Sequence, residues 1–175
     1  MKKFKLTSEF IVDISGVKLF RIKALIEFGN VKAGDLGGYI EKEENLSHMG
    51  DAWVSDDARI SGNAQVFGNA RVSGNAQVSG NARVSGNARV SGDAQVFGDA
   101  RVSGDKDYAY AHGFGSCNRT TTFFRLKDGD VGVRCGCFYG TLAQFRDKVC
   151  ETHGETKKAQ EYLMLADLMK LRFEK

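Results

Sequence analysis

From Gly50 to Gly104 the chain repeats apolar and polar positions with a period of six residues, close to Gly-Asn-Ala-Arg-Val-Ser, and without an insertion. Each unit has one alanine and, two residues later, one β-branched residue. The nine pairs are Ala52/Val54, Ala58/Ile60, Ala64/Val66, Ala70/Val72, Ala76/Val78, Ala82/Val84, Ala88/Val90, Ala94/Val96 and Ala100/Val102. A fixed short period is the signature of a solenoid. Because side chains two apart share one face of a strand, we expect Ala and Val inside and the Arg or Gln between them outside.

Six residues supply one short strand and one corner, since the glycine of Ser-Gly-Asn or Ser-Gly-Asp accepts a positive φ. Three sides close a triangular coil of 18 residues, so the nine units predict about three regular coils of a left-handed parallel β-helix. A flat solenoid with two sides and 12 residues per coil is the alternative, and it predicts different stacking partners. A disordered low-complexity segment is disfavoured by the strict phasing of Ala and Val.

The segments on either side of the repeat predict two terminal units. Residues 1–33 alternate apolar and polar side chains and predict a β-hairpin cap. The solenoid is assigned to residues 34–106, with an imperfect first coil in which Ile40 and Leu46 take the alanine position. The ends of a solenoid have unpaired strand edges and an open core, so we expect these units to cover them.

After residue 106 the period disappears, and residues 107–175 predict an α+β unit in an otherwise mainly β protein. Strands are expected over 108–116, 120–126 and 131–137, with a hairpin turn before the last. Thr141 and Gln144 form a capping box that opens a first helix, which Gly154 ends. A second helix is expected over about 156–172.

Composition restricts the function further. The net charge of +3, from 25 basic and 22 acidic residues among 175, is too small to indicate nucleic-acid binding by itself. The chain lacks the apolar run of a signal peptide or a membrane helix, which predicts a cytoplasmic protein without a membrane partner.

The cysteines and histidines after the repeat give a weak signal for a metal. Cys135 and Cys137 form a C-x-C pair, and Cys117, Cys150, His112 and His153 lie in the same part of the chain. This spacing matches no standard zinc pattern, and free cysteines are common as small buried side chains in a reducing compartment. We expect no metal, no cofactor and no catalytic thiol.

The run Val-Lys-Ala-Gly-Asp-Leu-Gly-Gly-Tyr-Ile at 31–40, followed by Asn-Leu-Ser at 45–47 and Gly-Asp-Ala-Trp-Val at 50–54, resembles the entry to hexapeptide-repeat proteins of the YdcK type. The resemblance covers about residues 1–105. Such proteins occur in enteric bacteria and, in shorter forms, in phages and prophages. The resemblance implies that copies of the chain associate along the sides of the solenoid. A phage setting implies a protein that binds a host component in the host cytoplasm, such as a defence protein, a nucleotide signal or nucleic acid.

Many hexapeptide-repeat proteins carry an acyltransferase label. Those enzymes use a histidine on a coil or on a protruding loop between subunits, whereas residues 50–104 contain neither such a loop nor a histidine, and His48 stands alone. We therefore expect a non-enzymatic binding protein. An acyltransferase that uses acyl-CoA is the alternative. A bactofilin-like filament is disfavoured because both ends carry units outside the repeat.

Several outward positions are candidate binding residues. Stacking at 18 residues places Arg71 beside Arg89, after Trp53, on one side and Arg83 beside Arg101 on another. These arginines either point into solvent or form a surface for an anionic partner, a host protein, a nucleotide or nucleic acid.

Phe67 and Phe97 replace serine at outward positions, which indicates contacts with a terminal unit or with another subunit of a homo-oligomer, a dimer or trimer. In the last unit, one hypothesis places His112, Arg119, Arg134 and Tyr139 around a polar pocket. The simpler interpretation of the alternating Thr and Phe there is one half-buried face of a sheet.

Overall fold

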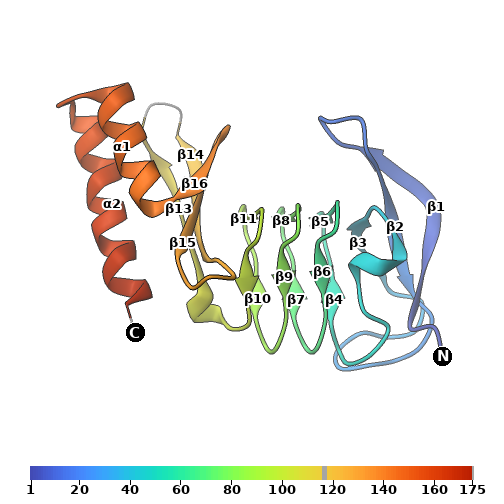
Figure 1. The fold of residues 1–175 in the computed structure, drawn as a ribbon. Coiled ribbons are helices and arrows are strands. Elements are labelled where there is room, and N and C mark those ends of the chain that lie inside the picture. The colour runs from blue at the N-terminus through green and yellow to red at the C-terminus, as the bar shows by residue number, and fades with distance from the viewer. Residues whose placement is uncertain (116–117, 175) are drawn as a thin grey trace.

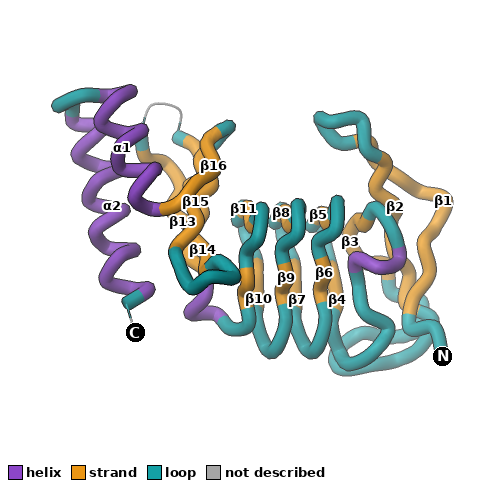
Figure 2. The backbone as a smooth tube through the Cα atoms, viewed as in Figure 1, coloured by secondary structure: helices purple, strands orange, loops and turns teal. Residues whose placement is uncertain are grey.

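A triangular stack of short parallel strands forms the middle of the molecule (Figure 1). The structure is a computed structural model that describes residues 1–115 and 118–174. The solenoid strands are β3 (Leu36–Ile40), β4 (Trp53–Val54), β5 (Arg59–Ile60), β6 (Gln65–Val66), β7 (Arg71–Val72), β8 (Gln77–Val78), β9 (Arg83–Val84), β10 (Arg89–Val90), β11 (Gln95–Val96) and β12 (Arg101–Val102). In Figure 2 they are short segments separated by corner loops.

The strands fall into three parallel rows, β3-β5-β8-β11, β4-β7-β10 and β6-β9-β12. Within the regular coils each residue pairs with the one 18 positions later, as Arg59 does with Gln77. This confirms the three-sided solenoid, and the flat two-sided form is wrong.

The number of coils is about four rather than three. The added coil contains β3 and the bridge between Leu46 and Val66. Ile40 lies beside Ile60, so both Ile40 and Leu46 take the valine position, and the expectation of the alanine position is wrong. Leu46 and Val54 are eight residues apart instead of six. Because of these two extra residues, Ile40 and Leu46 take the valine position although counting back in steps of six from Ala52 reaches them.

The core of the solenoid consists of the repeated alanines and β-branched residues. All nine alanines and all nine β-branched residues are at most 1% exposed. One hexad cannot bury its apolar face alone, so each coil depends on the coils above and below it.

Side-chain ladders connect the coils at the corners. The amide of Asn63 donates to Asn81 (3.3 Å) and that of Asn81 donates to Asp99 (3.3 Å). Parallel bonds join Asn69 to Asn87 and Asn75 to Asp93. An amide both donates and accepts, so it continues a ladder, whereas a carboxylate only accepts and suits the last rung. Lys42 and Lys127, from the two ends of the solenoid, contact the first and last rungs of the Asn63 ladder.

At the N-terminal end, β1 (Phe4–Val12) and β2 (Lys18–Ala24) form an antiparallel hairpin that extends the β3 row. Phe4, Ile22 and Ala24 join the solenoid core. Beyond these residues the hairpin projects past the stack (Figure 1). A 3-10 turn, η1 (Glu43–Asn45), follows β3.

At the C-terminal end, η2 (Asp105–Asp107) leads into the sheet β13 (Tyr108–Phe114), β14 (Arg119–Arg125), β15 (Val131–Cys135) and β16 (Phe138–Thr141), followed by α1 (Leu142–His153) and α2 (Lys157–Phe173). Tyr108 and Phe124 from one face of this sheet pack into the solenoid core. Phe123 and Val133 from the other face pack against the helices. The sheet therefore closes the last coil while the helices cover its outer side.

The C-terminal sheet also satisfies backbone groups of the last coil. The backbone N–H of Gln95 donates to Thr122 Oγ1 (2.8 Å), and the Tyr108 hydroxyl donates to the Arg89 carbonyl (2.7 Å). Buried backbone groups without partners are costly, so these bonds replace those that a further coil would supply.

Both predicted helix starts are confirmed. Thr141 and Gln144 form the reciprocal bonds of the capping box, and Thr156 caps α2. Across the described ranges, neither helix has the length and apolar character needed to span a bilayer.

Candidate functional site

The β5-β8-β11 row lies between the projecting β1-β2 hairpin and the C-terminal sheet (Figure 1). Side chains of all three parts line a trough over this row. Its hollow has a volume of about 470 Å³. The hairpin turn at residues 13–17 lines one end, and Phe97 and Arg134 line the other. Both terminal units and the solenoid contribute to its lining.

The floor of the trough is a row of outward side chains in register. Arg59 pairs with Gln77 and Gln77 with Gln95, on strands about 4.8 Å apart. Tyr39 of β3 extends the row toward the hairpin. Because each of these strands is bonded to a neighbour, the backbone positions that carry the guanidinium and the two amides have fixed spacing.

The hairpin end is held by polar contacts. The Arg21 guanidinium donates to the Tyr39 hydroxyl (2.8 Å), which in turn donates to Glu9 (3.2 Å). The bond to Tyr39 is the main cause that raises the pKa of Arg21, so this cation stays charged. At the tip, Asp13 accepts from the backbone N–H groups of Ser15 and Val17.

The opposite end is aromatic and cationic. The Arg134 guanidinium lies 4.9 Å from the centre of the Phe97 ring, and the Tyr139 ring meets Phe97 edge-on at 5.0 Å. Phe97 therefore packs beneath the C-terminal unit, which was one of the two contacts expected for the outward phenylalanines. Phe67 is 38% exposed in a separate hollow near Glu43 and His48, and a contact with another subunit stays a prediction.

The predicted stacking of the outward arginines is present, but one of the two rows is partly covered. Trp53, Arg71 and Arg89 lie in register, as do Arg83 and Arg101. Trp53 is only 4% exposed because it packs edge-on against Phe28, at 5.4 Å, so its expected place on a free surface is wrong.

Arg71 is partly buried beside Gly29, whereas Arg89 is exposed. On the other side Arg83 is exposed, and Arg101 donates to the carbonyls of Asn81 and Ala100. The segment that precedes β3 thus covers Arg71. Each arginine row keeps one exposed member, Arg89 or Arg83, and one partly buried member, Arg71 or Arg101.

The polar pocket considered for the C-terminal unit is divided in two. His112 and Arg119 line a hollow with Gln95, and His112 Nδ1 lies 2.9 Å from Thr120 Oγ1. Arg134 and Tyr139 lie opposite each other on β15 and β16, over Phe97. Thr120, Thr121 and Thr122 belong to a strand, β14, as the simpler interpretation predicts, but this strand is buried on both faces, so the expectation of one half-buried face is wrong.

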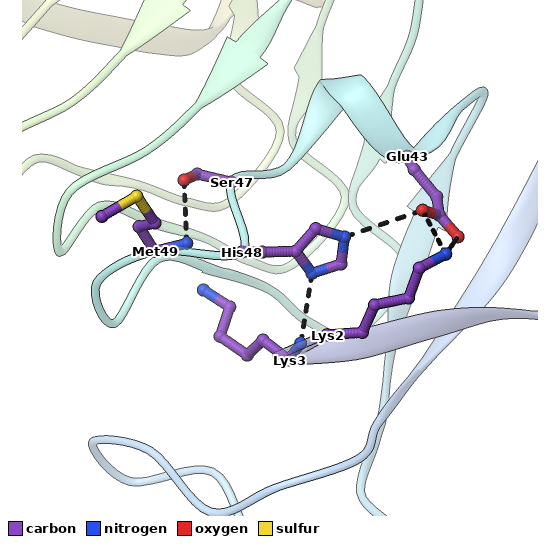
Figure 3. A network of polar contacts seen from close by, with 6 residues as sticks. All are labelled: Lys2, Lys3, Glu43, Ser47, His48 and Met49. Carbon is purple, nitrogen blue, oxygen red and sulfur yellow. Dashed lines mark hydrogen bonds and ion pairs between the residues drawn. The ribbon is translucent and has the colours of Figure 1, made fainter.

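His48 occupies a structural position at the N-terminal end (Figure 3). Its Nδ1 accepts from the backbone N–H of Lys3 (3.2 Å), its ring stacks on Phe4 at 4.3 Å, and its Nε2 lies 3.7 Å from Glu43. The Glu43 carboxylate accepts from the Lys2 ammonium (2.9 Å), which is the main cause that lowers the pKa of Glu43. The imidazole thus fastens the first strand to the imperfect coil.

The cysteines do not form a metal centre in the part of the chain that the structure describes, where no three ligand-type side chains gather. Cys135 is partly buried and contacts Thr121 Oγ1 at 3.2 Å, while Cys137 and Cys150 are exposed. Cys117 lies outside the described residues.

The trough contains residues that the sequence did not single out. The period places Arg59, Gln77 and Gln95 in one row, but nothing in that pattern shows that the hairpin turn rises beside this row rather than beside another. Of the predicted candidates, Phe97 and Arg134 are the two that line the trough.

Comparison with known proteins agrees with the geometry of the stack. A family model described as YdcK Beta solenoid repeat matches residues 64–80, 76–92 and 94–105. The solenoid is thus a YdcK-like β-solenoid repeat. No curated protein matches the chain.

Proposed function

We propose that this is a non-enzymatic binding protein whose trough holds an extended, acidic segment of a partner protein. The observation that carries the proposal is the trough itself, a row of donors carried on paired strands, with Arg59 near one end of its lining and Arg134 at the other. A guanidinium suits a carboxylate because it donates two parallel hydrogen bonds. A floor that is already ordered loses little conformational entropy on binding.

The acidic side chains of the lining support this assignment. Glu41 accepts from the backbone N–H of Gly62 (2.6 Å), and Asp13 is engaged within its own turn. Both carboxylates therefore have local donors, and Arg59 and Arg134 line the same hollow. The two amides of Gln77 and Gln95 supply further donors and acceptors between them.

The setting of this activity is part of the proposal. In a phage or prophage protein, the partner is a host component in the host cytoplasm, such as a defence protein. A homo-oligomer, dimer or trimer, is proposed as well, with the exposed Phe67 as its candidate contact.

The test uses a fluorescent ten-residue peptide of alternating Gly and Glu, with binding followed by fluorescence anisotropy. The double variant Arg59→Gln, Arg134→Gln is compared with Arg83→Gln, Arg101→Gln, which removes the same charge from another face. We expect the trough variant to weaken binding by about tenfold or more, and the control by much less.

Equal losses in the two variants would indicate unspecific attraction, and a larger loss in the control would assign binding to the other arginine row. Either result, or no binding by the wild type, contradicts the proposal. A pull-down from cell lysate with the same three proteins then identifies the natural partner.

A further inference from the structure

A second hollow, of about 260 Å³, lies within the C-terminal unit on the helix side of its sheet. Phe145 and Val149 of α1 form one wall, Phe138 of β16 forms another, and Tyr162 of α2 lies beneath them. The hollow shares no lining residue with the trough. It is therefore independent of the proposed protein-binding site.

The walls are aromatic and already ordered by one another. The Phe138 and Phe145 rings are 5.6 Å apart, and the Tyr162 ring meets Phe145 edge-on at 5.7 Å. Phe145 and Tyr162 are 3% and 6% exposed. Aromatic rings favour edge-on and offset contacts with further rings, so these walls suit a flat aromatic guest.

The volume limits the size of such a guest. An apolar cavity of roughly 150 Å³ binds benzene. Pockets for drug-sized molecules begin at about 300 Å³. A hollow of about 260 Å³ lies between these limits and has room for one or two rings.

The rim carries positive charge. Among the lining residues, Arg119 and Lys148 are the charged ones, His153 lies beside them, and no Asp or Glu is present. Lys148 forms an exposed pair with Glu151 at 2.9 Å, and such pairs are weak and easily exchanged. Arg119 lies against Gly136, where a Cβ would be 2.6 Å from its Nη1. Arg119 thus stands between this hollow and the neighbouring one that contains His112, because it lines both.

We infer that this hollow is a binding site for a small aromatic carboxylate. The rings lie against the wall that Phe138 and Phe145 form, and the carboxylate meets the Arg119 guanidinium at the rim. The apolar walls supply burial of the rings, and the cations give the preference for an anion.

The chain contains a built-in reporter for this site. Cys137 is exposed and lines the hollow, whereas Cys150 is exposed on α1 but does not line it. Alkylation of both thiols by iodoacetamide is followed by mass spectrometry, with 2-naphthoate as ligand and 2-naphthol as its uncharged counterpart. We expect 2-naphthoate to slow alkylation of Cys137 by about fivefold or more, with little change at Cys150.

Variants separate the contribution of the rings from that of the charge. Thr152→Trp, at an exposed position of the rim, should block the hollow and abolish protection by 2-naphthoate. Arg119→Gln should weaken 2-naphthoate by about tenfold while leaving 2-naphthol unchanged. Lys157→Gln, which removes a charge elsewhere on α2, should behave as wild type.

Three results would overturn the inference: no protection of Cys137, equal protection of Cys150, or equal protection by 2-naphthoate and 2-naphthol. The peptide assay on Thr152→Trp keeps the two sites apart. Retained peptide binding with lost naphthoate protection is expected, and loss of both would show that the hollow is not an independent site.

Discussion

The Lys3 ammonium donates a hydrogen bond of 2.8 Å to the carbonyl oxygen of Ala52, the first alanine of the repeat. It also donates to the Gly50 carbonyl (3.1 Å) and lies over the Phe28 ring. On another side of the triangle, Asn45 donates in the same way to the carbonyls of Gly62 and Ala64. Side-chain donors thus replace the missing coil at the N-terminal end.

The buried Lys3 ammonium should make the free energy of unfolding depend on pH. Burial, with a smaller effect of Arg71, lowers the pKa of Lys3 from 10.5 to about 8, against an opposing effect of Asp51. Between about 8 and 10.5 the unfolded chain keeps a proton that the folded chain has lost, so the free energy of unfolding rises with pH. The rise from this group is about 3 kcal/mol.

The Lys3→Met variant should lack this rise. Urea unfolding of both proteins from pH 7 to pH 10.5 isolates it, because other groups titrate in both. The same dependence on pH in wild type and variant would show that the ammonium does not titrate in this range.

Replacing Asn45 by Leu should lower the free energy of unfolding by about 3 kcal/mol, because the buried carbonyl of Ala64 and the partly buried carbonyl of Gly62 lose their donor. Asn45 is only 1% exposed. The matched control, Asn63→Leu, removes an exposed ladder amide and should cost about 1 kcal/mol or less. Denaturant unfolding measures both, and equal losses would contradict the capping role of Asn45.

The corner glycines differ in what they tolerate. Gly80 has φ +73°, and a Cβ there would lie 2.9 Å from the Gly98 nitrogen of the next coil. Gly80→Ala should therefore cost about 2 kcal/mol or more. Gly104 has extended backbone and nothing within 4 Å of a Cβ, so Gly104→Ala should be nearly neutral. A comparison of melting temperatures checks both, and a tolerated Gly80→Ala would mean that the coils can move apart.

Phe124 connects the C-terminal sheet to the solenoid core and is fully buried. Phe124→Ala should cost about 3 to 5 kcal/mol. Phe67→Ala, at a ring that is 38% exposed, should cost about 1 kcal/mol or less. Chemical denaturation compares the two, and a mild effect of Phe124→Ala would show that the sheet and the solenoid unfold independently.

The regular coils were predictable because every contact within them repeats. The spacing of two residues decides which side chains point inward, and Ala64 and Val66 need no information from elsewhere in the chain. The same rule places arginine and glutamine outside, and their rows follow once each coil has three sides. The capping box at Thr141 was also visible, since its two partners are three residues apart.

The candidate site was less predictable. Phe97 and Arg134 were recognised as separate candidates, but their contact joins residues from different units. Trp53 has the same position in its hexad as Arg71, yet it is covered by Phe28 from outside the repeat. Neither fact has a local signal in the sequence.

The local period of the hexads was enough to predict a solenoid with an Ala and Val core and outward Arg and Gln, because the same six residues recur in every neighbour. The choice of three sides over two, and with it the partners within each outward row, came from the stacking in the structure. Only the tertiary structure decided where the non-periodic segments cross that stack: the valine position of Ile40, the burial of Lys3 and the walls of the trough. Those features depend on contacts between distant residues, such as the 49 positions that separate Lys3 from Ala52, and a short repeat carries no information about contacts of that range.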